Sequence, residues 1–137
     1  VMPEEVAQRV TQIGINLHSC TAAFTQLAGV EALTGPQDSV ETMRSTFEKR
    51  RDFIVEGLNA LPGFRCISPG GAFYAFPNIE GTGKTARELA DLILNEAGVA
   101  LLPGTAFGAH GEGFLRLSFA NSRENITLAL ERIAGVL

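Results

Sequence analysis

The stretch Phe114-Leu-Arg-Leu-Ser-Phe-Ala120 decides how the rest of the chain is interpreted. Every second residue is apolar, which predicts a β-strand with one side facing the core. The core-facing residues are Leu115, Leu117 and Phe119. Arg116 falls on the opposite face with Phe114 and Ser118. Because a guanidinium is almost never fully buried without a partner, an arginine on this face of a central strand predicts an anion there.

Two interpretations of Arg116 are open from its residue type and position. The first is a structural ion pair on a solvent-facing sheet surface. The second is a binding site for a carboxylate or phosphate, because the planar guanidinium fork matches such anions. Glycine-rich loops at 68–71 and 103–113 would help to build that site, since a ligand can approach their backbone closely. Phe73 and Tyr74 are then either core aromatics or a wall of the site.

Composition narrows the class of protein. The chain has 137 residues, of which 45% are hydrophobic and 19% charged, as in an ordinary globular domain. A formal net charge of -4 without a basic run argues against a nucleic-acid partner. No apolar run approaches the roughly 20 residues that span a bilayer, so no membrane partner is expected. Cys20 and Cys66 have no pairing framework around them, which favours free thiols and a cytoplasmic location.

The first part of the chain is expected to be helical, with helices at residues 3–17, 22–34 and 38–61. The second helix is apolar nearly all round, so it should be buried or lie in an interface. Ser19 or Thr21 is available as its N-cap. The third helix is longer than average and has an apolar stripe that runs from Val40 to Leu61. Such a helix often bridges two bodies.

From residue 64 onward the elements follow the order β-β-α-β-β-α. Strands are expected at 64–67, 72–76, 99–102 and 114–120. Residues 68–71 would close a hairpin between the first two strands with a four-residue loop. The fold class expected is therefore α/β (α+β), in which a helical N-terminal segment precedes a small, largely antiparallel sheet with helices on one face.

Two helices pack on the sheet in this prediction. The first begins at Thr85-Ala-Arg-Glu88, which has the form of a capping box, and ends at Gly98. The second is capped by Asn121 or Ser122. Its inward residues are expected to be Ile126, Leu130, Ile133 and Leu137.

Motifs of catalysis and metal binding are scarce in the sequence. There is no Cys-x-x-Cys, no His-Glu-x-x-His and no acidic cluster, so no metal ligand is predicted. His18 and His110 stand alone, and no Ser-His-Asp triad can be assembled from the spacing. The loop at 104–113 lacks the Gly-Lys-Ser/Thr ending of a phosphate loop. No catalytic residue is therefore predicted in this chain.

Three segments, in the right order and spacing, resemble the carboxy-terminal part of class I/II aminotransferases. These are pyridoxal-phosphate enzymes of fold type I, and they include the aspartate aminotransferase group. The segments are Ser68-Pro-Gly-Gly-Ala-Phe-Tyr-Ala-Phe-Pro77, Leu92-Ile-Leu-Asn-Glu-Ala-Gly-Val-Ala-Leu-Leu-Pro-Gly-Thr-Ala-Phe-Gly108 and Gly111-Glu-Gly-Phe-Leu-Arg-Leu-Ser-Phe-Ala120. Gln26-Leu-Ala-Gly-Val-Glu-Ala-Leu33 resembles the family's helix after the cofactor region.

The resemblance covers essentially the whole chain and implies two parts. Residues 1–36 would be the helical tail of a large domain that binds pyridoxal phosphate. Residues 37–137 would be the small domain, including the long bridging helix. The apolar faces of the first two helices would then lack their native partner, which favours self-association of the chain.

The resemblance also implies roles for individual residues. In the family, the arginine of the Leu-Arg-Leu-Ser-Phe strand binds the α-carboxylate of the substrate, and Arg116 takes that position. Phe73 matches an aromatic residue near the substrate pocket. Gly104, with Pro103 and Phe107, matches a segment that lines the pocket and forms a hinge.

Some parts of the family's active site are not expected in this chain. The lysine that binds pyridoxal phosphate should lie upstream of Val1, because Lys49 and Lys84 are not in the family's Ser-Lys context. No residue that binds the cofactor is expected between positions 1 and 137. Since Val1 is not an initiator methionine, we expect the chain to start within a longer one and to be inactive alone.

The activity implied for the parent protein is transfer of an amino group between an amino acid and a 2-oxo acid. A lyase or decarboxylase with the same fold and cofactor is one alternative, because fold alone does not fix the reaction. A regulatory ligand-binding domain without enzymatic activity is another. Segment 14–22, with Asn16, Ser19 and Thr21, matches a region near the partner subunit's active site, so the resemblance implies a homodimer.

Overall fold

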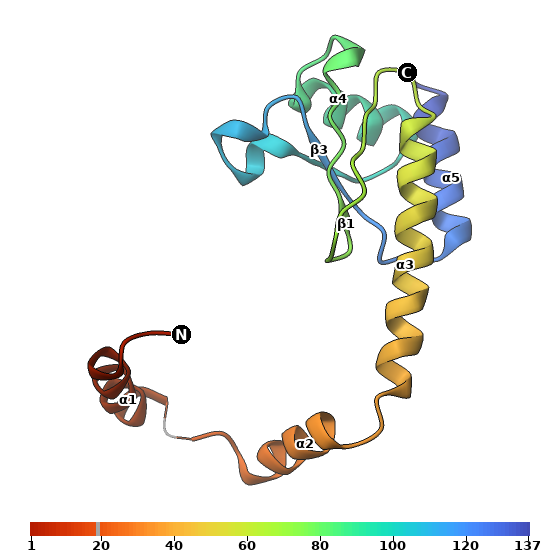
Figure 1. Ribbon diagram of the computed structural model, residues 1–137. Helices are drawn as coiled ribbons and strands as arrows, with labels where there is room; N and C mark the ends of the chain where they lie inside the picture. The colour runs from red at the N-terminus through yellow and green to blue at the C-terminus, as the bar shows by residue number, and fades with distance from the viewer. Residues whose placement is uncertain (19) are drawn as a thin grey trace. The chain divides into compact units, whose positions relative to one another are not determined.

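Figure 1 shows the computed structural model of the chain, which describes residues 1–18 and 20–137. The chain divides into two compact units, Val1–Ser39 and Val40–Leu137. The predicted fold class is confirmed, since helices come first and a small antiparallel sheet with further helices follows. The assignment of residues 1–36 to a larger cofactor-binding domain stays a prediction.

The first unit is helical and leaves its apolar side chains exposed. Helix α1 spans Glu4–His18 and α2 spans Ala23–Thr34, close to the predicted ranges, and neither has a buried residue. Neither these nor any other helix in the described ranges is long and apolar enough to cross a membrane. The exposed apolar residues include Val6, Val10, Ile13, Phe24, Leu27, Val30 and Leu33.

Of the two predicted N-caps of α2, only Thr21 can be compared with the structure. The cap position is occupied by Ala22, which makes no side-chain hydrogen bond, so the prediction of Thr21 is wrong. The alternative cap, Ser19, lies outside the described residues. Asn16 and Thr21 are exposed, and their contact with a partner subunit stays a prediction.

Helix α3 spans Asp38–Asn59, and its apolar stripe is buried only toward its C-terminal end. Ile54 and Leu58 lie in the core, and Leu61 follows them just beyond the helix. Val40 and Met43 belong to the same stripe but are 51% and 55% exposed. The N-terminal half of α3 therefore presents an apolar face that this unit does not cover.

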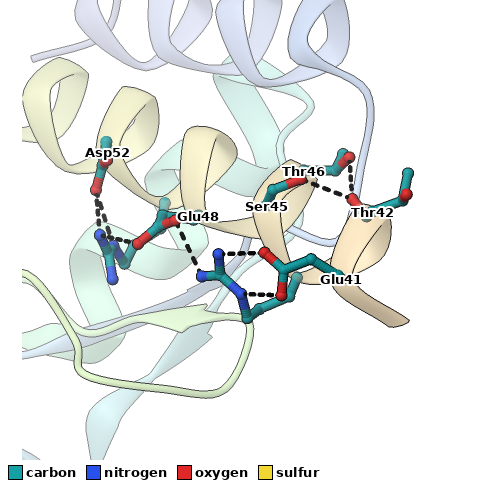
Figure 2. Close-up of polar contacts among 8 residues, drawn as sticks. Glu41, Thr42, Ser45, Thr46, Glu48 and Asp52 are labelled. Atoms are coloured by element: carbon teal, nitrogen blue, oxygen red, sulfur yellow. Dashed lines mark hydrogen bonds and ion pairs between the residues drawn. The ribbon is translucent and has the colours of Figure 1, made fainter. Parts of the chain in front are cut away.

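Ion pairs run along the exposed side of α3 and are drawn in Figure 2. Arg44 lies 2.6 Å from Glu41 and 3.0 Å from Glu48, while Arg51 lies 2.7 Å from Asp52. A hydrogen bond from Arg44 is the main reason that the pKa of Glu41 is lowered. Pairs three or four residues apart support a helix locally, here in the region where little of α3 is buried.

The second unit is built on a three-stranded antiparallel sheet with the order β1-β3-β2. Strand β3 pairs Ser118 with Tyr74 of β1 and Arg116 with Leu102 of β2. The strand that contains Arg116 is therefore the central one, as the sequence predicts. The strands are Tyr74–Ala75 (β1), Leu102–Pro103 (β2) and Leu115–Ser118 (β3).

The predicted alternation of β3 is confirmed. Leu115, Leu117 and Phe119 are at most 7% exposed, whereas Arg116 is half-buried on the other face. The inner residues form one core cluster with side chains of three helices. These helices are α3, α4 (Ala86–Leu92) and α5 (Arg123–Ala134).

The predicted hairpin with a four-residue loop is wrong. The N–H of Arg65 donates to the carbonyl of Asn78 at 2.9 Å, and the N–H of Asn78 donates to the carbonyl of Arg65 at 2.8 Å. The segment that connects this pair is 66–77, which is longer than the predicted loop 68–71. At Cys66 the side chain of Asn59 takes both backbone groups, accepting from N–H at 2.8 Å and donating to the carbonyl at 3.0 Å. Residues 64–67 are thus held by the end of α3 and contribute one bridge instead of a strand.

Several helix-terminus signals are confirmed. Thr85 and Glu88 form the capping box of α4. Ser122 is the N-cap of α5, where its hydroxyl accepts the N–H of Asn125. Gly98 ends the helical segment with a φ of 64°, in the left-handed region that glycine adopts without strain.

Two details of the helices differ from the prediction. Regular α-helix ends at Leu92, and the chain continues to Gly98 as a π-helical turn over Ile93–Ala97. Leu137 is 39% exposed rather than directed inward, because α5 ends at Ala134, and beyond the helix it is Val136 that packs against the core.

Each unit contains one cysteine, so the reactivity of each thiol probes one unit. Cys20 is exposed, whereas Cys66 is buried, and burial raises the pKa of its thiol. Because the thiolate is the reactive form, we expect Ellman's reagent at neutral pH to modify Cys20 quickly and Cys66 only after unfolding in guanidinium chloride. The variant Cys20→Ser should retain only the slow thiol. Two fast thiols in the native chain would contradict the core described for the second unit.

Candidate functional site

Arg116 projects from the outer face of β3 and is flanked by two aromatic rings. Its guanidinium carbon lies 4.4 Å from the ring centroid of Tyr74 and 4.1 Å from that of Phe107. Tyr74 belongs to β1, and Phe107 ends the 3-10 turn Gly104–Phe107 after β2. An aromatic face within about 6 Å of a guanidinium attracts its positive charge. Two separate elements therefore hold the side chain, which stays partly exposed.

Arg116 has no anionic partner in the part of the chain that the structure describes. The ion pairs found there lie on α3 and α4 and involve Arg44, Arg51 and Arg87. The interpretation of Arg116 as a structural ion pair consequently finds no carboxylate among the described residues. Its N–H donors are left for water or a ligand.

A close contact between two glycine backbones places Phe107. Gly104 and Gly111 are both buried, and a Cβ added to either one would collide with backbone atoms of the other. The N–H of Gly104 also donates to the carbonyl of Phe114 at 2.8 Å, which ties the loop to the start of β3. The ends of the loop are thus pinned together, and Phe107 lies between them in sequence, over the arginine.

Glu112, the acidic residue that follows this loop, is engaged elsewhere. Its Oε1 accepts the N–H of Ala86 at 2.8 Å and the N–H of Gly113 at 3.1 Å. Ala86 is the first residue of α4, and the unpaired N–H groups of a helix start favour a negative charge. The carboxylate therefore links the loop to α4 instead of neutralising Arg116.

Further aromatic side chains continue across the outer face of the sheet. Phe76 stacks on Phe114 with ring centroids 5.2 Å apart and meets Phe107 edge-on at 6.5 Å. A hollow of about 240 Å³ is lined by Phe76, Phe107 and the loop that contains Gly108 and Gly111. Since an exposed sheet face is usually polar, this face is suited to an apolar partner or ligand beside the cation.

The sequence predicts Arg116, Phe73 and Gly104 for the site, and the structure gives them different positions. The ring of Phe73 packs against Phe47 of α3 at 6.3 Å and against Tyr74 at 4.4 Å. The ring over Arg116 is that of Tyr74, not Phe73. Gly104 shapes the loop through its backbone. Substrate binding by these three residues stays a prediction.

The contact between Tyr74 and Arg116 is not predicted from the sequence, although part of its signal is present. Alternation over 72–76 places Tyr74 and Phe76 on one face. Pairing of this segment with β3 then brings that face to Arg116, because diagonal neighbours on paired strands are within reach of aromatic side chains. The predicted hairpin assigns residues 72–76 a different strand partner, which hides the contact.

The fold and this site define a class of protein. Residues 1–133 match the family described as aminotransferase class I and II, and the chain belongs to that family. The aspartate aminotransferase of Pyrococcus horikoshii is 39% identical over 139 residues, which cover 100% of this chain and 36% of that protein. The aromatic-amino-acid aminotransferase 2 of Thermococcus litoralis is 36% identical over 98% of this chain and 35% of its own length. The chain thus spans about a third of these relatives.

Solved structures agree with this assignment. The aromatic aminotransferase from Pyrococcus horikoshii OT3 has a TM-score of 0.91 and 37% identity, covering 100% of this chain and 37% of that one. The aspartate aminotransferase from Rhizobium meliloti has a TM-score of 0.88 and 38% identity, covering 98% of this chain and 36% of that one. The resemblance inferred from the three sequence segments is therefore confirmed.

The family implies pyridoxal phosphate in the parent enzymes, and neither lysine of this chain is placed to hold it covalently. A covalent link to the cofactor needs a lysine amine in a shielded pocket. Lys49 and Lys84, the two lysines of the sequence, are both exposed, one on α3 and one just before α4. Within the described ranges there is also no group of three His, Cys, Asp or Glu residues that could hold a metal ion.

The glycine contact can be tested by substitution. Gly104→Ala places a Cβ against the carbonyl of Gly111, so we expect the free energy of unfolding to fall by roughly 1–3 kcal/mol, as in other overpacked sites. Urea unfolding followed by circular dichroism measures it. Gly70→Ala is the matched control, because nothing lies within 4 Å of the added Cβ. Equal effects of the two substitutions would show that the backbone contact is unimportant.

Proposed function

We propose that the whole protein containing this chain is an aminotransferase that uses pyridoxal phosphate and moves an amino group between an amino acid and a 2-oxo acid. In this proposal Arg116 binds the α-carboxylate of the substrate. The observation that carries it is a half-buried arginine on the central strand, flanked by aromatic rings and without an acidic partner among the described residues. Membership of the aminotransferase family supports the reaction type.

The chemistry of a guanidinium explains why this residue suits the task. A carboxylate accepts two parallel hydrogen bonds from its planar fork, which fixes both oxygens and therefore the direction of the bond to the α-carbon. Holding the substrate at two points limits how its α-carbon can turn, and such orientation lowers the barrier of the reaction. A lysine at this position would supply charge but not the two-point geometry.

The proposed division of labour follows from what this chain contains. Pyridoxal phosphate, when bound in the whole protein, supplies the electron sink for bond changes at the α-carbon. The part of this chain is to bind and orient the carboxylate, and the lysine that holds the cofactor is assigned to a part of the whole protein outside these 137 residues. We also propose a cytoplasmic homodimer, which is supported by two free cysteines and by the resemblance of segment 14–22 to a region near the partner subunit.

The test is substitution of Arg116 in the full-length protein. We expect Arg116→Ala to lower kcat/KM for the amino acid about 100-fold, because the half-buried charge partner of the carboxylate is lost. The kcat/KM of Arg116→Lys should lie between that of Arg116→Ala and that of the unsubstituted protein, because lysine keeps the charge but lacks the planar fork. The assay follows transfer from L-aspartate, L-phenylalanine and L-alanine to 2-oxoglutarate.

Arg87→Ala is the control for this experiment, because Arg87 is exposed on α4 and pairs only with Asp91 at the surface. An Arg116→Ala enzyme with unchanged kcat/KM would refute the assigned role. Product analysis separates the other interpretations of the sequence. Ammonia would identify a lyase and carbon dioxide a decarboxylase, while amino-acid binding without turnover would identify a regulatory domain.

A further inference from the structure

We propose that Tyr74 and Phe107 are positioning residues for Arg116. Their rings hold the guanidinium in its binding orientation and replace the acidic partner that the arginine lacks. The identity of the bound anion rests on the proposed function. The contacts between the rings and the arginine do not, because they are properties of the second unit alone.

The first step of the argument is the contrast between Arg116 and Arg44. Arg44 donates from Nε and both terminal nitrogens to Glu41 and Glu48, at 2.6 to 3.0 Å. An arginine held in this way has its donors occupied and its charge compensated, so it is a poor receptor for a carboxylate. Arg116 is also held in place, but by ring faces, which attract the cation without accepting its N–H groups in the plane of the guanidinium.

The second step is that each ring is fixed by the fold. Tyr74 faces Ser118 in the β1–β3 register, which makes it the diagonal neighbour of Arg116 on the same face. Phe107 is placed by the contact between Gly104 and Gly111. The fold positions each ring without help from Arg116, so the two rings can together hold the arginine side chain in one orientation.

The third step is that both rings contact further aromatic side chains. Tyr74 packs on Phe73 with centroids 4.4 Å apart, and Phe107 meets the edge of Phe76 at 6.5 Å. Phe76 in turn stacks on Phe114 at 5.2 Å. These aromatic side chains have few rotatable bonds, so they limit the motion of the long, flexible side chain of Arg116. This confinement lowers the ordering cost that carboxylate binding would otherwise incur.

This arrangement predicts an effect on affinity and not on the chemical step. A variant that lacks one ring keeps the guanidinium fork, so a substrate that does bind is still held at two points. The rings therefore change how readily Arg116 is placed for binding, equally for the bound ground state and the transition state. Removing one ring should therefore raise KM and leave kcat nearly unchanged.

The first measurement uses this 137-residue chain and needs no cofactor or substrate. In NMR spectra, ring currents should shift the side-chain Hδ and Nε–H resonances of Arg116 upfield from their free-arginine positions. Tyr74→Leu or Phe107→Leu should remove much of that shift, while Tyr74→Phe and Phe107→Tyr, which keep the ring, should preserve it. Unshifted Arg116 resonances in the unsubstituted chain would overturn the proposal without any variant.

Phe53→Leu is the matched control. The Phe53 ring lies 4.4 Å from the guanidinium carbon of Arg123, a second cation–ring pair between α3 and α5 that has no part in the site. This substitution should move the Arg123 resonances and leave those of Arg116 in place. An equal response of Arg116 to Phe53→Leu and to Tyr74→Leu would show general loosening of the fold and overturn the positioning role.

The second measurement is steady-state kinetics of the full-length protein with L-aspartate, L-phenylalanine and L-alanine. We expect Tyr74→Leu and Phe107→Leu each to raise KM for the best of these about fivefold with kcat within twofold, and Tyr74→Phe to restore the original KM. If Arg116→Ala raises KM but both leucine variants leave it unchanged, the positioning role is wrong and the proposed function stands. If Arg116→Ala leaves kcat/KM unchanged, the carboxylate assignment fails, and the NMR measurement alone then decides whether the rings position Arg116.

Discussion

Strand β3 exchanges backbone hydrogen bonds with β1 on one edge and with β2 on the other, so its register is fixed from both sides. Because side chains alternate along a strand, the register that buries Leu115 and Leu117 also obliges Arg116 to face outward. A slip by one residue would bring a guanidinium into the apolar core and expose two leucines. The free energy of core formation therefore specifies on which face of the sheet the charge lies.

The helical first unit and the outer face of the sheet share a property. Both present apolar side chains that this chain does not cover, such as Leu27 and Leu33 of α2 and Phe76 and Phe107 beside Arg116. Exposed apolar patches of this kind usually mark interaction or ligand surfaces. Their presence is consistent with the finding that the chain spans about a third of its relatives. In those longer proteins, further residues are available to pack against such surfaces.

Local signals in the sequence are sufficient for much of the fold. The alternation around Arg116, the capping box of Thr85 and Glu88, and the glycine stop at Gly98 are read correctly because each depends on neighbours a few residues away. The strand partner of residues 72–76 is instead β3, which is distant in sequence, while the amide of Asn59 takes both backbone groups of Cys66. The ring contact on Arg116 follows from that pairing, so the fine geometry of the site lies beyond what residue patterns determine.

The backbone contact between Gly104 and Gly111 has a consequence for how such a site diversifies. Closure of the loop depends on two residues without side chains, so it is insensitive to the identity of most residues between them. Thr105, Ala106, Ala109 and His110 can therefore be exchanged on a fixed frame, whereas Phe107 contacts Arg116 and Gly108 has a φ of 126°, which favours glycine. Changes at Ala109 and His110 alter the lining of the hollow, while the register of the sheet and the position of Arg116 are preserved. Selectivity and structural integrity therefore depend on different residues of the loop: exchangeable residues line the hollow, and Gly104 and Gly111 close the loop.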